Sequence, residues 1–141
     1  MSPNIMIALG ASLFFILGAL HLRLTVLDLK HPRFFLPANK ALLEELKATR
    51  VNFRKDVKNF WLSYLGFHFS HSAGVMFYAL TVAYLGLVRP DVLHDIVVRM
   101  VIVAFGASWV LMSRHFWFVI PLAGSALGVT LIAIGMAMLA P

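Results

Sequence analysis

Four long stretches of apolar residues constrain this chain more than any other feature of its sequence. They cover residues 5–27, 60–88, 92–112 and 116–140, and polar connections separate them. An α-helix rises about 1.5 Å per residue and a bilayer's hydrocarbon core is about 30 Å thick, so each stretch can cross a membrane. Of the 141 residues, 61% are hydrophobic and 13% charged, too apolar for one soluble core of this size. We therefore predict a single all-α transmembrane domain, with four transmembrane helices in an antiparallel bundle.

The first polar connection, residues 28–59, differs from the apolar stretches that flank it. Asn39 is a favourable N-cap residue for a short helix that we expect to end near Val51. The three leucines of this helix share one face, and its charged residues lie mostly away from that face. We predict a short amphipathic helix at the membrane interface, between the first and second transmembrane helices.

The basic residues predict the orientation of the chain in the membrane. Residues 23–59 contain 9 of the 12 lysines and arginines, and Arg114 lies between the third and fourth stretches. Only Arg89 and Arg99 fall on the opposite side. Because basic connections stay in the cytoplasm, segment 28–59 should be cytoplasmic and both termini should lie on the non-cytoplasmic side. The net charge of +6 is then explained by orientation and contact with membrane lipids, without a nucleic-acid partner.

Polar residues around the third stretch suggest how it is connected. Asp95 and Arg99 are four residues apart and can pair along a helix. Residues 113–115 form a short connection to the fourth stretch, so these two helices should be antiparallel neighbours. We expect Pro121 to bend the fourth helix near its start or to lie in its first turns.

Small residues predict where helices approach closely. Gly124 and Gly128 form a G-x-x-x-G pattern in the fourth stretch, and Gly10 and Gly18 lie on nearly one face of the first. Such faces allow helices to pack tightly in lipid. The sequence leaves two interpretations open: packing within the bundle, or a face for self-association.

The second stretch carries the polar residues that are most informative about function. His68 and His71 are three residues apart and share a helical face with Tyr64, and Ser70 lies between them in sequence. His21 lies near the cytoplasmic end of the first stretch, in the same cytoplasmic half as His68 and His71. Polar side chains within a membrane are costly and are functional candidates by default. We take these five residues as a candidate cofactor-binding set.

Several kinds of chemistry fit this set. The histidines and serines could simply hydrogen-bond between helices and fix the bundle. Imidazole also ligates haem iron, so a haem b could lie between His21 and either His68 or His71. A quinone pocket is a further alternative. His68 and His71 could also bind a metal ion, although the membrane stretches contain no Asp or Glu near them.

Catalytic signatures are missing from the sequence. There are no cysteines, no G-x-S-x-G motif, no P-loop and no paired acids within the apolar stretches. We therefore predict no catalytic residues and expect a non-enzymatic subunit or accessory protein of a membrane assembly, either a homo-oligomer or a larger complex. The alternative is a redox protein that binds haem b or quinone. A transporter or channel is a third interpretation, without the internal repeats typical of transporters.

Residues 60–74 have the sequence FWLSYLGFHFSHSAG. This segment resembles the second helix of an uncharacterised family of small four-helix bacterial membrane proteins, with the pattern W-x-x-W-x-G-F-N-x-S-H-S-x-G. Residues 18–21, Gly-Ala-Leu-His, are similar to a Gly-x-x-His element of the same family. Tyr64 replaces the second Trp of the pattern, and His68 replaces its Asn. The resemblance implies a four-helix fold and a bacterial inner-membrane location, and it implies no substrate.

Overall fold

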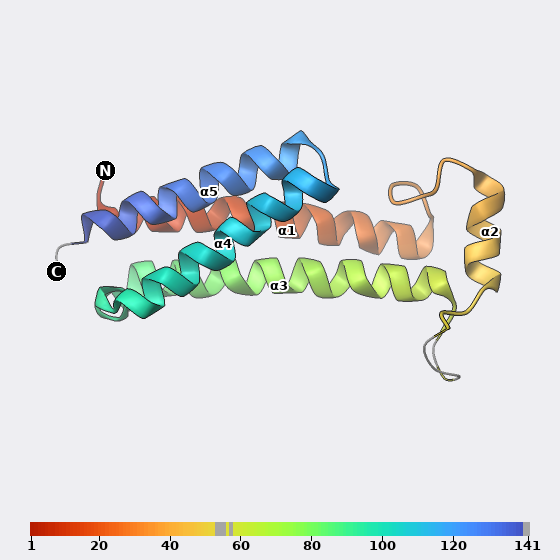
Figure 1. The fold of residues 1–141 in the computed structure, drawn as a ribbon, viewed down its shortest axis with the longest axis horizontal. Helices are drawn as coiled ribbons and strands as arrows, with labels where there is room; N and C mark the ends of the chain where they lie inside the picture. Colours follow the sequence, from red (N-terminus) through yellow and green to blue (C-terminus); the bar gives the residue numbers. More distant parts are fainter. Residues whose placement is uncertain (53–55, 57, 140–141) are drawn as a thin grey trace. The chain divides into compact units, whose positions relative to one another are not determined.

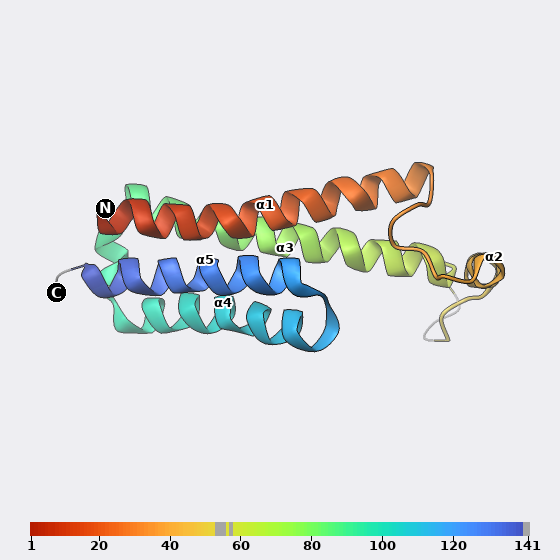
Figure 2. The same cartoon turned by 90° about the horizontal axis from the view of Figure 1, so that it is seen from above.

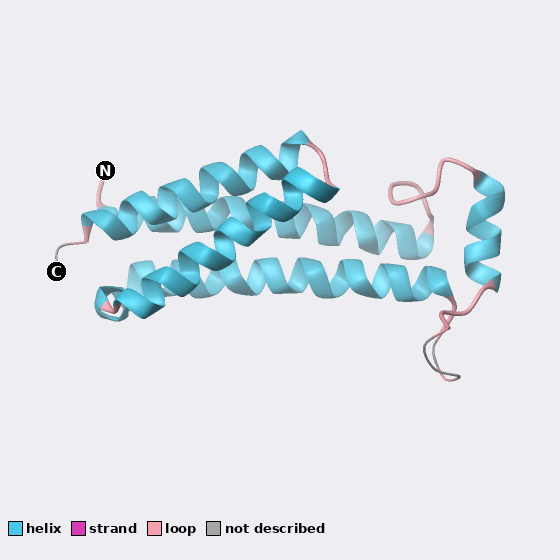
Figure 3. Cartoon of the chain, in the orientation of Figure 1, coloured by secondary structure: helices cyan, strands magenta, loops and turns pink. Residues whose placement is uncertain are grey.

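A computed structural model describes residues 1–52, 56 and 58–139 of the chain (Figure 1). The elements in chain order are α1 (Pro3–Lys30), α2 (Lys40–Ala48), α3 (Phe60–Val88), the 3-10 helix η1 (Pro90–His94), α4 (Ile96–Phe116) and α5 (Val119–Met138). The described part contains no strand, and its single β-bridge joins Arg50 to Asn59 (Figure 3). Helices α1, α3, α4 and α5 are each long and apolar enough to span a membrane. The prediction of an all-helical chain with four such helices is confirmed.

The third long helix begins later than predicted, at Ile96 rather than residue 92. Pro90 starts a 3-10 turn, and the Asp95 carboxylate then caps α4 by accepting hydrogen bonds from the N–H groups of Val97 and Val98. Asp95 therefore does not take the predicted role of ion-pair partner to Arg99, whose Nε donates to the carbonyl oxygen of Leu93. A carboxylate at a helix N-terminus satisfies backbone donors that would otherwise lack partners.

The connection between α4 and α5 also lies later than predicted. Residues 113–115 continue α4, and the chain leaves the helix at Trp117 and Phe118. Arg114 and His115 suit the last turn of a helix because their side chains favour its negative end. Pro121 falls in the first turn of α5, where its missing N–H costs nothing. The predicted end of this helix at residue 140 lies outside the described residues.

Helix α2 confirms the predicted cap at Asn39, whose side-chain oxygen accepts a hydrogen bond from the N–H of Ala41 at 3.0 Å. The helix ends at Ala48, three residues before the predicted end. There the chain turns extended at Thr49, and the Thr49 carbonyl oxygen accepts from the N–H of Phe60 at 2.8 Å. This hydrogen bond and the neighbouring bridge draw together the two ends of the segment between α2 and α3.

The chain divides into two compact units, and α1 and α3 contribute to both. The terminal unit contains Met1–Leu17 and Val75–Pro141, and the histidine unit contains Gly18–Gly74. In the terminal unit α4 and α5 lie side by side (Figures 1 and 2), as the short connection predicted. Its buried hydrophobic core has ten members: Ile7, Ala11, Phe14, Tyr78, Ala79, Val82, Leu93, Ile102, Ile132 and Met136.

One buried tyrosine ties three helices of the terminal unit together. The Tyr78 hydroxyl on α3 donates a hydrogen bond to the carbonyl oxygen of Ile102 on α4 at 2.9 Å. Its ring meets the edge of Phe14 on α1, with centroids 5.1 Å apart. A Cβ at Gly106 would lie 2.8 Å from the Tyr78 hydroxyl oxygen, so glycine leaves room for this contact.

Glycines bring α1 and α5 into backbone contact within the same unit. A Cβ at Gly10 would lie 2.5 Å from the carbonyl oxygen of Gly128, and one at Gly128 would lie 2.8 Å from the Phe14 ring. A Cβ at Gly124 would meet the Leu17 side chain at 2.9 Å. The G-x-x-x-G face of α5 is thus covered by α1 of the same chain.

The turn between α3 and α4 carries a bidentate ion pair. Arg89 donates to the two carboxylate oxygens of Asp91, at 2.7 Å for the shortest bond. This pairing holds the pKa of the Asp91 carboxyl below its ordinary value and raises the pKa of Arg89. Both side chains are exposed, so the pair contributes little to stability.

We expect Gly10→Ala to destabilise the protein by about 1–3 kcal/mol, because the new Cβ would strike backbone rather than a movable side chain. Gly66→Ala is the matched control, since a Cβ there has no atom within 4 Å. Alanine favours a helix over glycine by about 1 kcal/mol, so the control should be neutral or stabilising. Thermal unfolding of both variants in the same detergent checks this, and equal losses of stability would contradict it.

Candidate functional site

The histidine unit presents three polar side chains along one face of α1. His21, Thr25 and Asp28 are spaced by four and three residues, which places them in a row on the helix. Thr25 and Asp28 are fully buried, and the Thr25 hydroxyl donates to the His21 carbonyl oxygen at 2.9 Å. This part of α1 therefore carries a row of polar side chains, of which Thr25 and Asp28 are fully buried.

The same spacing recurs on α3, where Tyr64, His68 and His71 form a matching row. Asn59 starts this helix by accepting a hydrogen bond from the N–H of Leu62 at 2.9 Å. Trp61, Leu65 and Ser72 flank the row and are buried. The Ser72 hydroxyl donates to the His68 carbonyl oxygen at 2.8 Å, so it is satisfied within its own helix.

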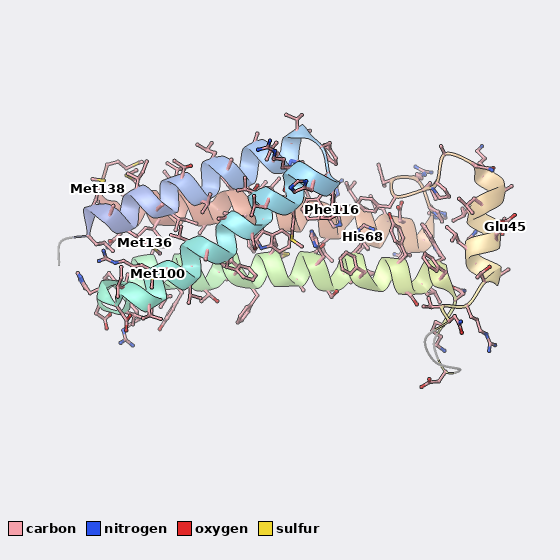
Figure 4. The ribbon with its side chains drawn as sticks, viewed as in Figure 1. Glu45, His68, Met100, Phe116, Met136 and Met138 are labelled. Carbon is pink, nitrogen blue, oxygen red and sulfur yellow. The ribbon has the colours of Figure 1, made fainter. Side chains whose placement is uncertain are left out.

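A hydrogen bond between two imidazole rings joins the two faces. Nε2 of His21 lies 2.8 Å from Nδ1 of His68, and Figure 4 shows His68 on α3. One nitrogen donates and the other accepts, so the pair has two tautomeric arrangements. The His71 ring completes a histidine cluster (His21, His68 and His71), with its centroid 5.3 Å from that of His21.

The second ring nitrogen of His68 is the unusual atom of the cluster. Nε2 is buried from solvent and has no hydrogen-bond partner. It is an unused donor in one tautomer and an unused acceptor in the other. Leaving such a group unsatisfied costs about 1–3 kcal/mol, and native structures rarely tolerate this without a reason. This atom is where a ligand would gain most from binding.

Aromatic rings enclose the histidine pair. Phe35 stacks on His68 with centroids 4.5 Å apart and planes at 13°, and it also contacts His21 at 4.8 Å. Tyr64 meets His68 edge-on, at 4.4 Å and 86°. Two aromatic rings therefore pack against the imidazole of His68.

A buried carboxylate holds Phe35 in this position. Asp28 accepts hydrogen bonds from three consecutive backbone N–H groups, those of Arg33 at 2.8 Å, Phe34 at 2.9 Å and Phe35 at 2.7 Å. The loop after α1 thereby folds back over the histidine cluster. Asp28 also acts electrostatically on His68 and Tyr64, so it is a charged neighbour of the site.

The structure brings together four of the five residues predicted from sequence: His21, His68, His71 and Tyr64. Ser70 is exposed, and its hydroxyl donates to the Phe67 carbonyl oxygen at 2.9 Å. It lies two residues from His68, which turns its side chain to nearly the opposite side of α3. Ser70 is therefore not part of the cluster.

Asp28 and Phe35 belong to the site but were not predicted from the sequence. An acidic residue near the C-terminus of a helix is unfavourable because it faces the negative end of the helix dipole. Asp28 stands in this unfavourable position near the end of α1, just before residues 31–37. This position indicates that its carboxylate has a partner elsewhere. Such a partner is found in the loop N–H groups.

A haem does not fit between the rings of His21 and His68 as they are arranged, and a haem between His21 and His71 stays a prediction. An iron between two imidazoles separates their nitrogens by two bonds of about 2.0 Å, taking zinc–imidazole lengths as the guide. The joined nitrogens of His21 and His68 are only 2.8 Å apart, and Phe35 covers His68. In the described part of the chain, no group of three or more His, Cys, Asp or Glu side chains is placed to hold a metal ion. A metal bound by His68 and His71 alone stays a prediction.

We expect Asp28→Asn to loosen the loop, because the amide keeps one acceptor oxygen for N–H groups that now use two. The loss should be about 1–3 kcal/mol, seen as a lower melting temperature and faster hydrogen exchange at residues 33–35. Glu44→Gln is the control, since its ion pair with Lys47 is exposed and worth under about 1 kcal/mol. Unchanged exchange at residues 33–35 would show that Asp28 does not hold the loop.

The chain was also compared with known proteins. No family model, no curated protein and no solved structure matches it. The resemblance of residues 60–74 to a bacterial membrane-protein family therefore stays a prediction, and the case for function rests on the residues of the histidine unit.

Proposed function

We propose that this chain is a small, non-enzymatic integral membrane protein that holds a membrane-soluble ligand at its histidine cluster, as an accessory subunit of a membrane assembly. The observation that carries this proposal is the buried, unpartnered Nε2 of His68. Phe35 and Tyr64 pack against the imidazole ring that carries this atom. A cluster that served only to fix the helices would have no reason to leave this nitrogen unsatisfied.

The proposed setting is a bacterial inner membrane, with α1, α3, α4 and α5 crossing it in alternating directions as an antiparallel bundle. The concentration of basic residues in 23–59 supports a cytoplasmic location for α2 and its flanking segments. Leu43 and Leu46 of α2 are partly covered and its charged residues are mostly exposed, which suits a helix lying at the interface. The histidine cluster then lies in the cytoplasmic half of the protein.

The assembly partner would contact a surface other than the G-x-x-x-G face, because α1 already covers Gly124 and Gly128. The spanning helices expose many large apolar side chains, among them Phe77 and Phe105, which lipid or a partner helix would cover. The small size and the lack of a catalytic residue set support an accessory role.

The orientation can be tested with single cysteines, since the natural chain has none. In intact cells, a membrane-impermeant thiol reagent should label Ser2→Cys, which lies on the proposed outer side. Lys40→Cys in α2 should react only after the membrane is opened. The reverse pattern, or labelling of both in intact cells, would contradict the proposed orientation.

Ligand binding can be tested by extracting the purified protein with organic solvent and identifying small molecules by mass spectrometry. His68→Phe removes both ring nitrogens but keeps a planar ring, so the amount of co-purified ligand should fall about tenfold, as expected for the loss of about 1.4 kcal/mol. His94→Phe is the control, because His94 is exposed in η1 outside the histidine unit.

Equal extracts from His68→Phe and His94→Phe, containing only bulk phospholipid, would overturn the ligand-binding proposal. An absorption spectrum of the same preparations adds a separate outcome. A Soret band that is present in the natural chain and lost in His68→Phe would identify the ligand as a haem. The rings of His21 and His68 would then have to move apart to make room for it.

A further inference from the structure

The four spanning helices form two classes of length. Helices α4 and α5 have 21 and 20 residues, whereas α1 and α3 have 28 and 29. At about 1.5 Å per residue, the shorter helices measure about 30 Å, which matches the hydrocarbon thickness of a bilayer. The longer helices exceed that thickness by about 12 Å, so part of each must lie outside the hydrocarbon or the helix must tilt.

Packing within the terminal unit shows at which end the excess length lies. A Cβ at Gly135, near the end of α5, would lie 2.9 Å from the carbonyl oxygen of Pro3, where α1 begins. A Cβ at Gly86, near the end of α3, would lie 2.7 Å from the Ile7 side chain. The three helices are therefore level with one another at this end. The excess of α1 and α3 lies at their other ends, within the histidine unit.

The histidine pair marks the point where the hydrocarbon should end. About twenty residues of helix cover 30 Å, and counting from the level ends gives residues 3–22 of α1 and 69–88 of α3. His21 and His68 each stand beside the inner limit of one of these ranges. The 2.8 Å hydrogen bond between their rings shows independently that the two positions are level. Two separate counts thus place the edge of the hydrocarbon at the same pair.

A cation lies at this level on the outward face of α1. Four exposed residues, spaced by four, three and four positions, share that face: Ile16, Leu20, Arg23 and Leu27. His21 is two residues from Arg23, which places it on nearly the opposite side of the helix. Among the residues that the structure describes, none forms an ion pair or a hydrogen bond with the Arg23 guanidinium. Its partner must therefore come from outside the described chain.

The chemistry of a guanidinium at this depth points to phosphate. A lone cation facing hydrocarbon is costly, so a long basic side chain extends its charged group to the headgroup layer. Phospholipid phosphates lie in that layer, and a planar guanidinium can donate two parallel hydrogen bonds to one phosphate. Lys30 and Arg33 are exposed nearby, whereas the acid among them, Asp28, is buried. This excess of positive charge favours a lipid with a net negative headgroup.

From these observations we propose that Arg23 binds the phosphate of an anionic phospholipid at the cytoplasmic edge of the hydrocarbon, level with the His21–His68 pair. The acyl chains of this lipid lie along Leu20 and Ile16, and α1 continues past Arg23 into the headgroup layer. The histidine cluster then borders that layer instead of lying deep in the hydrocarbon. This site goes beyond the proposed function, which assigns no role to Arg23, and it takes only the side of the membrane from the proposed orientation.

Dioctanoyl phosphatidylglycerol, a short-chain anionic phospholipid, tests the site in the full-length protein in neutral detergent. We expect saturable binding, measured as a rise in melting temperature. Binding should be about tenfold weaker in Arg23→Gln, because a hydrogen bond between two charged groups is lost. Arg89→Gln is the matched control, since it removes an exposed guanidinium that is already bonded to Asp91. Equal affinity in the two variants would overturn the proposal.

Two further compounds separate the contributions of the lipid tail and of the net charge. Inorganic phosphate at the same concentration should not raise the melting temperature, because it has no acyl chain to lie along α1. An equal rise with inorganic phosphate would overturn the choice of a lipid. Dioctanoyl phosphatidylcholine should bind more weakly than the anionic lipid, and equal binding would overturn the preference for an anionic headgroup.

A depth measurement tests the level of the site without changing Arg23. Nitroxide labels are attached to Leu20→Cys and Leu27→Cys, which flank Arg23 on the exposed face of a chain without natural cysteines. In liposomes, we expect the label at 20 to collide more with oxygen and the label at 27 to collide more with a water-soluble nickel complex. Preference for oxygen at both positions would place the hydrocarbon edge beyond Leu27 and overturn the proposal. Neither test depends on a ligand at His68, so failure here leaves the proposed function standing.

Discussion

The carboxylate of Asp28 is the interaction on which the histidine unit depends. Backbone N–H groups away from water must find partners within the protein, and the loop after α1 offers three consecutive donors to one buried side chain. These hydrogen bonds fix the loop, the loop places Phe35, and Phe35 covers the bonded imidazoles of His21 and His68. The same carboxylate that satisfies the backbone also acts electrostatically on His68.

The terminal unit is held by a different constraint, the close approach of backbones. Gly10 and Gly128 let α1 and α5 meet without intervening side chains, and Gly106 leaves space for the hydroxyl of Tyr78. Because lipid is as apolar as these side chains, tight packing and buried hydrogen bonds hold such helices together. The two units therefore differ in kind: one is packed through small residues, and the other is organised around polar groups.

The sequence predicted the four long helices because hydropathy and length alone decide which segments are apolar enough to cross a membrane. Their ends were harder to predict, because the start of α4 depends on a cap at Asp95 rather than on the first apolar residue. Spacing on α3 was enough to group Tyr64, His68 and His71. Asp28 and Phe35 could not be grouped with them, since the fold of the loop between α1 and α2 is set by contacts rather than by periodicity.

The ion pair between Arg89 and Asp91 has a consequence for how the chain enters a membrane. In the proposed orientation, the short connection between α3 and α4 must pass through the bilayer during insertion. A lone guanidinium crossing hydrocarbon carries a large electrostatic cost, whereas Arg89 is bonded to a carboxylate two residues away. A connection that crosses as a neutral pair is cheaper to translocate than one that carries a lone guanidinium.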